Sequence, residues 1–505
     1  MTEPVLIVGA GPVGMTLAME LARYGVPLRI VDKAAARTDK SKALVLWSRT
    51  LELLERGPGA SRFIAAGFKV NAVNMISRDQ TVGHVDMSSI NSPYPFALML
   101  PQSETERLLE ERLGELGVKV ERSVAATALS FAGDRVEAVL TRADGTQEKV
   151  VTPWLAGCDG AHSLVRHSVG AGFAGETLNS DWILADVHMT GYPSADTEAS
   201  VYWHKDGAFV IFPISPGRYR ILADQPPSDA EHPPEPSLEK VQSVMNERGP
   251  SGMRAYDPIW LAGFRINGRK VASYRWGRAF LLGDAAHVHS PAGGQGMNTG
   301  MQDAFNLAWK LALVVRGNAT EQLLDSYSIE RSEVGDQVLK NAGRLTTIGT
   351  LRNTVLQNLR NVAGHALLGL TAVQHAVADN LSEVSIGYLH SPLNGPAQAP
   401  AGPKPGQRFA PVDGQKPAGS GDTPRFTLMA ATTPATSNLV ARFSQVLDPD
   451  IRAPLSQGGL WLIRPDGYVA CSATEPRSIA DYLTLSCGGP PHGGPPLNDP
   501  TEARG

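Results

Sequence analysis

The chain opens on a pattern of apolar runs and turns that is typical of a parallel α/β sheet. Val5–Val8 is wholly apolar, as expected for a strand buried on both faces. Residues 13–24 then follow a helical pattern that ends at Gly25, a common residue just after a helix. Leu28–Val31 predicts a second strand, with Asp32 at its end. The order of strand, turn, helix, strand and acid indicates a dinucleotide-binding unit.

The turn between the first strand and the helix carries three spaced glycines. Gly9 permits a tight turn, Gly11 lets the backbone approach a pyrophosphate, and Gly14 lets the helix pack closely on the strand. Asp32 stands where a carboxylate accepts the hydroxyls of an adenosine ribose, whereas Lys33 also fits the phosphate of NADP. This unit therefore leaves both FAD and a nicotinamide cofactor open. Its candidate residues are Gly9, Gly11, Pro12, Gly14, Asp32 and Lys33.

A later segment favours FAD. The apolar run Ala279–Leu282 predicts another buried strand, which leads to Gly283 and Asp284. Ligands bind at the carboxyl ends of such strands, where Asp284 would accept hydroxyl hydrogens from a ribityl chain, a group that nicotinamide cofactors lack. The loop 290–296 has almost no side-chain bulk, so a flat ring would lie against its backbone. A helix beginning near Met297 would aim free N–H groups at that ring.

The same segment belongs to a long motif that resembles one enzyme family. Residues 283–300 read Gly-Asp-Ala-Ala-His-Val-His-Ser-Pro-Ala-Gly-Gly-Gln-Gly-Met-Asn-Thr-Gly, and residues 302–311 read Gln-Asp-Ala-Phe-Asn-Leu-Ala-Trp-Lys-Leu. This stretch resembles the single-component FAD-dependent aromatic hydroxylases, the group A flavoprotein monooxygenases related to p-hydroxybenzoate hydroxylase and phenol hydroxylase. The resemblance implies an α/β fold: a Rossmann-like FAD-binding domain of the glutathione reductase type, an inserted antiparallel β-sheet substrate domain and a C-terminal thioredoxin-like domain.

The resemblance also implies roles for single residues. Residues 157–166 look like the family's Asp-Gly fingerprint, in which Asp159 and Arg166 help hold FAD and take part in the use of NAD(P)H. Pro291 matches a proline near the reacting face of the flavin, and Gln102 a glutamine that contacts FAD. Asp159, Arg166 and Pro291 are therefore the expected catalytic residues. The other expected cofactor residues of the later motif are Gly283, Asp284, Gly294, Gly296, Met297 and Asn298.

One position departs from the family pattern. Relatives usually carry an arginine before alanine near the FAD phosphates and ribityl chain, whereas this chain has Lys42 before Ala43. Lysine keeps the charge but loses the planar fork, so Lys42 is expected to contact the cofactor less firmly. Arg49 opens the next predicted helix, and the sequence leaves open whether it faces the flavin or solvent.

The separation of the cofactor motifs implies a discontinuous FAD-binding domain with other structure inserted. Four runs with strand patterns favour an antiparallel insert: Trp182–Val187, Ala199–Trp203, Phe209–Pro213 and Tyr219–Leu222. The expected parts are 1–180 (FAD-binding, with 76–100 contributing to the substrate domain), 181–269 (substrate sheet), 270–391 (FAD-binding and helices), 392–421 (linker), 422–487 (thioredoxin-like) and 488–505 (disordered tail). The last module has no Cys-x-x-Cys, so scaffolding or a dimer contact is expected of it.

The predicted sheet offers four candidate substrate residues, Tyr202, His204, Phe212 and Tyr219. An aromatic substrate needs apolar walls, and a phenol needs an acceptor or base. Ordinary sheet packing is the alternative for each of them. No metal is expected, because His287 and His289 supply too few ligands for a site and no third ligand is suitably placed in the sequence.

Length and composition limit the number of domains, the class of binding partner and the expected compartment. At 505 residues the chain requires two or three domains. Lys+Arg 46 against Asp+Glu 50 gives a net charge of -4 with no basic tail, which argues against nucleic-acid binding.

Three scattered cysteines fit a reducing cytoplasm. Met1 leads almost directly into the first strand, so no signal peptide is expected. Residues 361–378 contain several polar side chains, which favours an amphipathic or core helix over a membrane span. A monomer or homodimer is expected.

The resemblance implies a reaction cycle. NAD(P)H reduces the flavin at N5, O2 reacts at C4a, and the resulting hydroperoxide delivers one oxygen to an electron-rich ring. The main hypothesis is hydroxylation of a phenolic or polycyclic aromatic compound, with NADPH favoured over NADH. The alternatives are epoxidation or Baeyer–Villiger oxidation of a polyketide, oxidative inactivation of a tetracycline- or rifamycin-type antibiotic, and an FAD-binding reductase without oxygen transfer.

Overall fold

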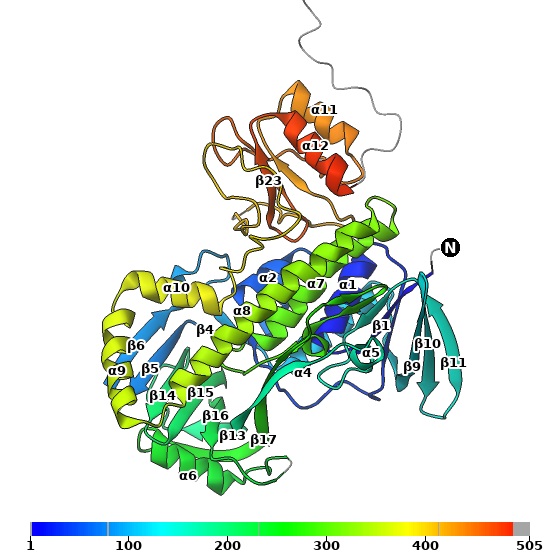
Figure 1. The fold of residues 1–505 in the computed structure, drawn as a ribbon. Coiled ribbons are helices and arrows are strands. Elements are labelled where there is room, and N and C mark those ends of the chain that lie inside the picture. Colours follow the sequence, from blue (N-terminus) through cyan, green and yellow to red (C-terminus); the bar gives the residue numbers. More distant parts are fainter. Residues whose placement is uncertain (1–2, 78–79, 231, 413, 488–505) are drawn as a thin grey trace, which may run out of the picture.

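The computed structural model describes residues 3–77, 80–230, 232–412 and 414–487. Figure 1 shows a central part of strands and long helices, a large sheet at the lower left and a small C-terminal part at the top. The tail expected to be disordered, 488–505, lies outside the described residues.

The central part is built on a six-stranded sheet in the order β18-β19-β12-β1-β2-β8. Its strands are β1 (Val5–Val8), β2 (Leu28–Asp32), β8 (Glu121–Arg122), β12 (Leu155–Gly157), β18 (Arg275–Trp276) and β19 (Ala279–Leu281). β1 runs parallel to β2 and β12, and β12 runs parallel to β19. The carboxyl ends of three strands therefore meet at one edge, and this brings Gly9, Gly157 and Gly283 together from distant parts of the sequence.

Helices and a small sheet cover this parallel sheet. α1 packs between α4 and the long, almost wholly buried α7, and α5 lies against β12. The elements are α1 (Pro12–Arg23), α4 (Gln102–Glu115), α5 (Leu164–Ser168), α7 (Gly296–Val315) and the antiparallel strands β9 (Val124–Ala132), β10 (Arg135–Arg142) and β11 (Gln147–Thr152).

The inserted part is an eight-stranded sheet in the order β20-β17-β13-β16-β15-β14-β5-β6. Its strands are β5 (Ala72–Ser77), β6 (Gln80–Asp86), β13 (Ala174–Thr190), β14 (Glu198–His204), β15 (Gly207–Ser215), β16 (Arg218–Gln225), β17 (Arg254–Lys270) and β20 (His287–Val288). The four strands expected from the sequence are confirmed, and β5 and β6 join them from an earlier part of the chain.

The two faces of the inserted sheet pack against different partners. One face, with Phe209 and Ile221, packs on Val244 and Met245 of α6 (Leu238–Arg248). The opposite face, with Phe212, joins the core around Trp47. That core includes the three-stranded sheet of β3 (Val45–Leu46), β4 (Phe68–Val70) and β7 (Ala97–Met99). We call these the outer and inner faces, because only the inner one lies toward the glycine loops.

Further helices join the parts. They are α2 (Ser48–Glu55), α3 (Ala60–Ala66), α8 (Asp325–Gly349), α9 (Thr354–Leu368) and α10 (Thr371–Leu381), with short 3-10 turns at Met87–Ser89, Gly283–Ala285 and Glu321–Leu324. α9 and α10 pack on β6, so residues 361–378 form a helix pair over a sheet. Within the described ranges, no helix combines the length and apolar character that crossing a membrane requires.

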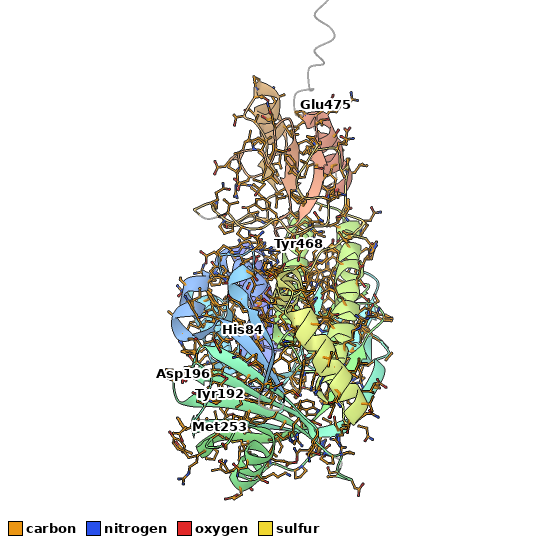
Figure 2. All side chains as sticks on the ribbon, turned by 90° about the vertical axis from the view of Figure 1, so that its left-hand side faces the viewer. His84, Tyr192, Asp196, Met253, Tyr468 and Glu475 are labelled. Carbon is orange, nitrogen blue, oxygen red and sulfur yellow. The ribbon has the colours of Figure 1, made fainter. Side chains whose placement is uncertain are left out.

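The C-terminal part has an antiparallel sheet in the order β21-β22-β23, with two helices together on one face. Its elements are β21 (Thr427–Met429), β22 (Leu460–Ile463), β23 (Val469–Ala473), α11 (Pro434–Arg442) and α12 (Pro476–Cys487). The preceding irregular segment is held along this part by backbone hydrogen bonds, such as Gly395 N to Ala470 O at 2.9 Å. Tyr468 lies at the junction with the FAD-binding part (Figure 2).

Candidate active site

The first glycine loop has the backbone that its spacing predicts. A Cβ at Gly14 would lie 1.9 Å from Gly9 O, and a Cβ at Gly9 would lie 2.3 Å from Cys158 O, so both glycines are needed for chain packing. A Cβ at Gly11 would meet no atom within 4 Å. α1 begins here with Pro12 and without a side-chain cap. The free N–H groups of this helix therefore face open space, as a pyrophosphate site requires.

Asp32 links the end of β2 to the same loop. Its carboxylate accepts hydrogen bonds from Ala10 N at 2.6 Å and Ala34 N at 2.8 Å. Arg122 lies 4.0 Å away. Each carboxylate oxygen keeps a lone pair for a ribose hydroxyl, while the neighbouring Lys33 is exposed.

The Asp-Gly fingerprint holds two loops in place. Asp159 accepts hydrogen bonds from Ser163 Oγ at 2.5 Å and Val165 N at 3.1 Å, at the start of α5. Arg166 donates to Ala161 O at 2.7 Å and Ala285 O at 3.2 Å. The two predicted catalytic side chains thus fix the backbone that surrounds Asp284.

Asp284 is exposed in the turn that follows β19. Desolvation raises the pKa of its carboxyl, and His287 and Lys42 oppose that shift. Gly283, with φ +55°, makes this turn, and a Cβ there would lie 2.9 Å from a Val13 methyl.

A buried acid that sequence reasoning missed stabilises the third loop. Asp303 accepts Gly283 N at 3.0 Å, His287 Nε2 at 2.8 Å and Arg331 Nε at 2.6 Å. Burial alone would raise the pKa of Asp303, but Arg331 and His287 lower it overall. Arg331 also donates to Thr299 O at 3.0 Å. Its partners lie far along the chain, so no local signal reveals this network.

The glycine-rich loop is shaped for a flat ligand. Gly293 and Gly294 have φ of +89° and +64°, which other residues rarely adopt. Asn298 donates to Gly294 O at 3.1 Å. α7 starts at Gly296 without a side-chain cap, so the N–H groups of its first turn, which includes Met297 and Asn298, have no intrahelical partner.

Two further residues border this loop. Pro291 is exposed, and its carbonyl accepts Gly294 N at 2.9 Å. His289 donates from Nδ1 to Ser290 O at 2.9 Å, and burial and His287 lower its pKa to about 4. His289 is therefore neutral at pH 7, and Nε2 of His287 is hydrogen-bonded to Asp303.

The loop around Lys42 is held by an arginine from the inserted sheet. Arg220 binds Asp186 through two hydrogen bonds of 2.7 and 2.9 Å. It also donates to Lys42 O at 3.0 Å and Ser41 O at 2.5 Å. Gln102 accepts Ala43 N at 3.2 Å. A cavity of about 260 Å³ adjoins this loop, lined by Asp39, Lys40, Ser41, Pro101, Ser103, Glu104, Asp186, Arg218, Ile259 and Trp260.

The four predicted substrate residues divide between the faces of the sheet. Phe212 lies on the inner face. Tyr202 and Tyr219 belong to the outer core with α6, and Tyr219 donates to Asp196 at 2.7 Å, a residue labelled in Figure 2. His204 lies at the strand end, beside Asp206. Alternation along the strands puts Tyr202 and Tyr219 on the side of the sheet that α6 covers, so Phe212 is the candidate on the inner face.

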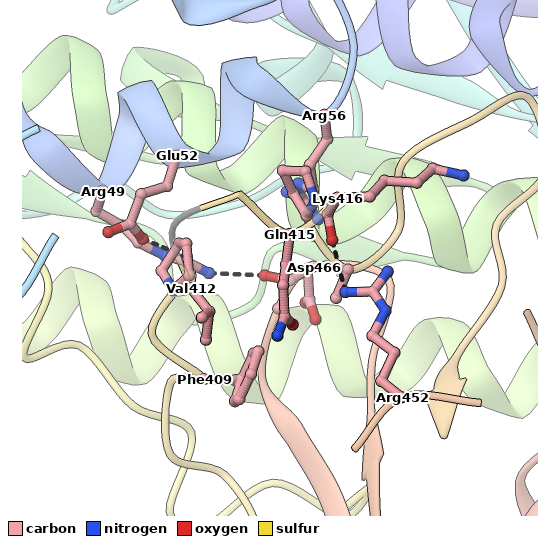
Figure 3. A pocket seen from close by; sticks show the side chains of 13 residues that line it. Arg49, Glu52, Arg56, Phe409, Val412, Gln415, Lys416, Arg452 and Asp466 are labelled. Atoms are coloured by element: carbon pink, nitrogen blue, oxygen red, sulfur yellow. Dashed lines mark hydrogen bonds and ion pairs between the residues drawn. The ribbon is translucent and has the colours of Figure 1, made fainter. Parts of the chain in front are cut away.

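Arg49, whose orientation the sequence left open, points toward the C-terminal part (Figure 3). Its guanidinium binds Glu52 at 2.9 Å and Asp466 O at 2.6 Å. It also lies 4.8 Å from the centre of the Tyr468 ring. Both Asp466 and Tyr468 belong to the C-terminal part. The buried side chain is thus engaged at the junction between the two parts and does not face solvent.

Taken together, the residues at the carboxyl edge of the sheet fit FAD. Two uncapped helix starts, at Gly11 and Gly296, provide N–H donors for a pyrophosphate and for the carbonyl edge of a flavin. Asp32 and Asp284 supply acceptors for ribose and ribityl hydroxyls. Loops free of side-chain bulk lie between these groups, as an extended dinucleotide requires.

Comparisons with known proteins agree with this geometry. The family model described as an FAD binding domain matches residues 2–342. The chain is 36% identical to 6-methylpretetramide 4-monooxygenase of Streptomyces rimosus, over 95% of this chain and 92% of the relative. It is 32% identical to an uncharacterized aromatic compound monooxygenase of Bacillus subtilis, over 96% and 99%.

A solved structure, the anhydrotetracycline hydroxylase OxyS of Streptomyces rimosus, superposes with a TM-score of 0.78 at 30% identity. The match covers 97% of this chain and 100% of the other. The match of family, sequence and fold over nearly the whole chain fixes the reaction class. The chain therefore belongs to the FAD-dependent aromatic hydroxylases and is a flavoprotein monooxygenase with FAD as its cofactor.

Proposed function

We propose that this enzyme uses NAD(P)H, with NADPH preferred, and O2 to hydroxylate a polycyclic aromatic polyketide. The observation that carries the proposal is the position of the inner face of the inserted sheet opposite the glycine-rich loop, joined through the core of Trp47 and Phe212. By name, the two Streptomyces rimosus relatives act on 6-methylpretetramide and on anhydrotetracycline. Both match more than nine-tenths of this chain, including the inserted sheet that would contact a substrate.

Bound FAD supplies the redox chemistry, from hydride acceptance to the transfer of one oxygen atom. The protein's own part is positioning. Free N–H groups at Gly296 and Met297 stabilise negative charge on the adjoining ring edge. Asp284 orients a ribityl hydroxyl, and the apolar inner face excludes water from the reacting ring. Pro291 is exposed at the same loop and would border the ring of bound FAD.

The nicotinamide substrate is assigned to the cavity beside Ser41. Lys40 and Arg218 would contact its phosphate groups, and Trp260 offers an aromatic surface. The acids Asp39, Glu104 and Asp186 line the same cavity. Asp159 and Arg166 act in this step through the loops that they hold. The enzyme acts in the cytoplasm, where its three unpaired cysteines stay reduced.

We also propose that the C-terminal part is a thioredoxin-like scaffold without redox activity, in a monomer or homodimer. Its sheet with two helices on one face supports this architecture. Burial raises the pKa of Cys471 and raises that of Cys487 to about 12. Both thiols therefore stay protonated and unreactive at neutral pH.

A coupled assay tests the main proposal. NADPH and NADH oxidation by the FAD-loaded enzyme is followed in air with pretetramide-type and angucycline-type compounds, simple phenols, a tetracycline and a rifamycin, while peroxide and product mass are recorded. Oxidation stimulated by the polycyclic compounds, with a product one oxygen atom heavier, supports the proposal. Turnover of the antibiotics alone would reassign the enzyme to inactivation, and peroxide as the sole product would favour a reductase.

A further inference from the structure

The turn after α10 packs directly against the glycine-rich loop. Gln295 Nε2 donates to Asn380 O at 2.8 Å, and a Cβ at Gly293 would lie 3.5 Å from Leu381 Cδ2. Glu383, two residues further on, has φ +62°, a conformation that residues other than glycine adopt only where the surrounding structure fixes it. The turn therefore holds Glu383 in one conformation beside the site that fits the flavin.

The carboxyl of Glu383 is fully buried, at 0% exposure, against the first turns of α7. It accepts Thr299 Oγ1 at 2.9 Å and lies 2.5 Å from Gln302 Nε2. Thr299 is the fourth residue of α7, so it lies about 4.5 Å along the helix axis from Gly296. Glu383 is thus bound about one turn behind the uncapped N–H groups that fit the carbonyl edge of a flavin.

No cation neutralises this carboxyl. Within the part of the chain that the structure describes, Glu383 forms no salt bridge. The charged groups that face it are Arg331 of α8 and Asp303 of α7, and these two bind each other at 2.6 Å. Arg49 of α2 turns its guanidinium to the C-terminal part. Because a buried carboxylate without a counterion is costly, burial raises the pKa of Glu383 to about 8, and the carboxyl is mostly protonated at neutral pH.

The neighbouring amide points to the same proton independently. Gln302 Oε1 is buried and has no hydrogen-bond partner, although buried acceptors are nearly always paired. Only a protonated Glu383 has an O–H to donate. A 180° turn of the Gln302 amide brings Oε1 to the position of Nε2, where it accepts that hydrogen. The amide therefore suits both forms of Glu383, with Oε1 facing the neutral acid and Nε2 facing the carboxylate.

We propose that Glu383 tunes the electrostatics of the flavin site: as a neutral acid it leaves the start of α7 positive, and as a carboxylate it opposes negative charge on bound FAD. A hydride carries two electrons and one proton, so its acceptance adds one negative charge to the flavin. A carboxylate about one helical turn away disfavours that added charge, and the low dielectric of the interior strengthens the effect. Hydride acceptance is therefore most favourable below pH 8 and becomes less so as Glu383 ionises. This effect needs only bound FAD, whichever aromatic compound is the substrate.

The midpoint potential of the bound flavin tests the proposal. It is measured by photoreduction beside a reference dye, from about pH 6 to 9.5 to span the ionisation, in the native enzyme and in Glu383→Gln, which cannot ionise. The difference is expected to be small at the acid end and to widen as pH rises, with the native potential the lower. Equal potentials at every pH overturn the proposal. A difference that does not change with pH also overturns it, because it shows a structural role alone.

Two further variants serve as controls. Glu247→Gln, at an exposed position of α6, should follow the native potential at every pH. Glu383→Asp keeps a group that ionises, so it should restore the dependence on pH that Glu383→Gln removes. A Glu383→Asp enzyme that behaves like Glu383→Gln contradicts the proposal.

Infrared difference spectroscopy of the native enzyme tests the proton directly and requires no variant. The C=O stretch of a carboxylic acid is expected at about pH 6.5 and should be lost by about pH 9.5. A spectrum without that change overturns the proposal, even where Glu383→Gln fails to hold FAD.

Discussion

Asn298 and Trp47 lock the glycine-rich loop against the start of α2. Trp47 N donates to Asn298 Oδ1 at 2.9 Å, and the Trp47 indole donates to Gly293 O at 2.9 Å. The Asn298 amide also donates to Val45 O at 2.8 Å. The side chain predicted to bind the cofactor thus shapes the loop that would receive the flavin.

Loss of the hydrogen bonds made by Asn298 is expected to weaken FAD binding. Asn298→Ala removes several buried hydrogen bonds at about 1 kcal/mol each, so the dissociation constant of FAD should rise about tenfold or more. Quenching of flavin fluorescence on titration into apoenzyme measures it. Asn246→Ala, on an exposed position of α6, is the control. Unchanged FAD affinity in Asn298→Ala would show that the lock is not needed.

Alanine substitutions at two glycines of the first loop are expected to have different effects, one on folding and one on FAD binding. Gly14→Ala forces a Cβ to within 1.9 Å of Gly9 O, so the protein should fold poorly or lose several degrees of thermal stability. Gly11→Ala meets open space, so the apoenzyme should keep its stability and lose FAD affinity. Thermal unfolding with and without FAD separates these outcomes.

Gly114→Ala provides the control for both, because a Cβ there meets no atom and alanine favours the interior of a helix by about 0.5–1 kcal/mol. A Gly11→Ala enzyme that binds FAD with native affinity would argue against a pyrophosphate at this turn.

The buried carboxyl of Glu383 predicts a pH-dependent stability. It accepts Thr299 Oγ1 at 2.9 Å and Gln302 Nε2 at 2.5 Å, and burial raises its pKa from 4.5 to about 8. A raised pKa gives stability that is present below pH 4.5 and is lost as pH rises toward 8. Glu383→Gln mimics the protonated form, so its stability relative to the native enzyme should grow across this range.

Urea unfolding between pH 5 and 8.5, a range chosen to span roughly that window, measures the difference. Glu247→Gln, at an exposed position, should run parallel to the native enzyme throughout. A constant difference between Glu383→Gln and the native enzyme at every pH would mean that Glu383 does not titrate as described.

The two faces of the inserted sheet give a prediction about kinetics. Phe212→Ala alters the inner face and is expected to raise KM for the aromatic substrate and to divert reducing equivalents to peroxide. Tyr219→Phe removes only the outer hydrogen bond to Asp196 and should leave KM, kcat and coupling unchanged. Steady-state oxidation with peroxide detection tests both. A kinetic effect of Tyr219→Phe equal to that of Phe212→Ala would contradict the assignment of the faces.

The sequence predicted the elements whose conformation is set locally. The β1 strand, the turn at Gly9 and the helix from Pro12 depend on neighbouring residues, and the structure has all three. The inserted strands were also found from alternation, but alternation does not say which face lies toward the cofactor. That choice depends on α6 covering one side, so the sequence could not show that Tyr202 and Tyr219 lie on the covered side.

The hydrogen-bond partners of buried polar side chains could not be predicted from the sequence, for a related reason. Arg220 pairs with Asp186 across two strands, and Arg49 binds Asp466 O, 417 residues away. A strand arginine or a helix arginine looks like a solvated charge until the chain is folded around it. Of these residues, only Arg220 gives a signal in the sequence, because it is a charged residue at an alternating position within an apolar strand.

Oxygen transfer is the central claim, and single turnover with isotopically labelled O2 tests it most directly. The FAD-loaded enzyme is reduced with NADPH in the presence of a polycyclic aromatic polyketide and then mixed with the labelled gas. The account predicts one labelled oxygen atom in the product and the other in water. Unlabelled product, or label recovered only as hydrogen peroxide for every polyketide tried, would contradict it.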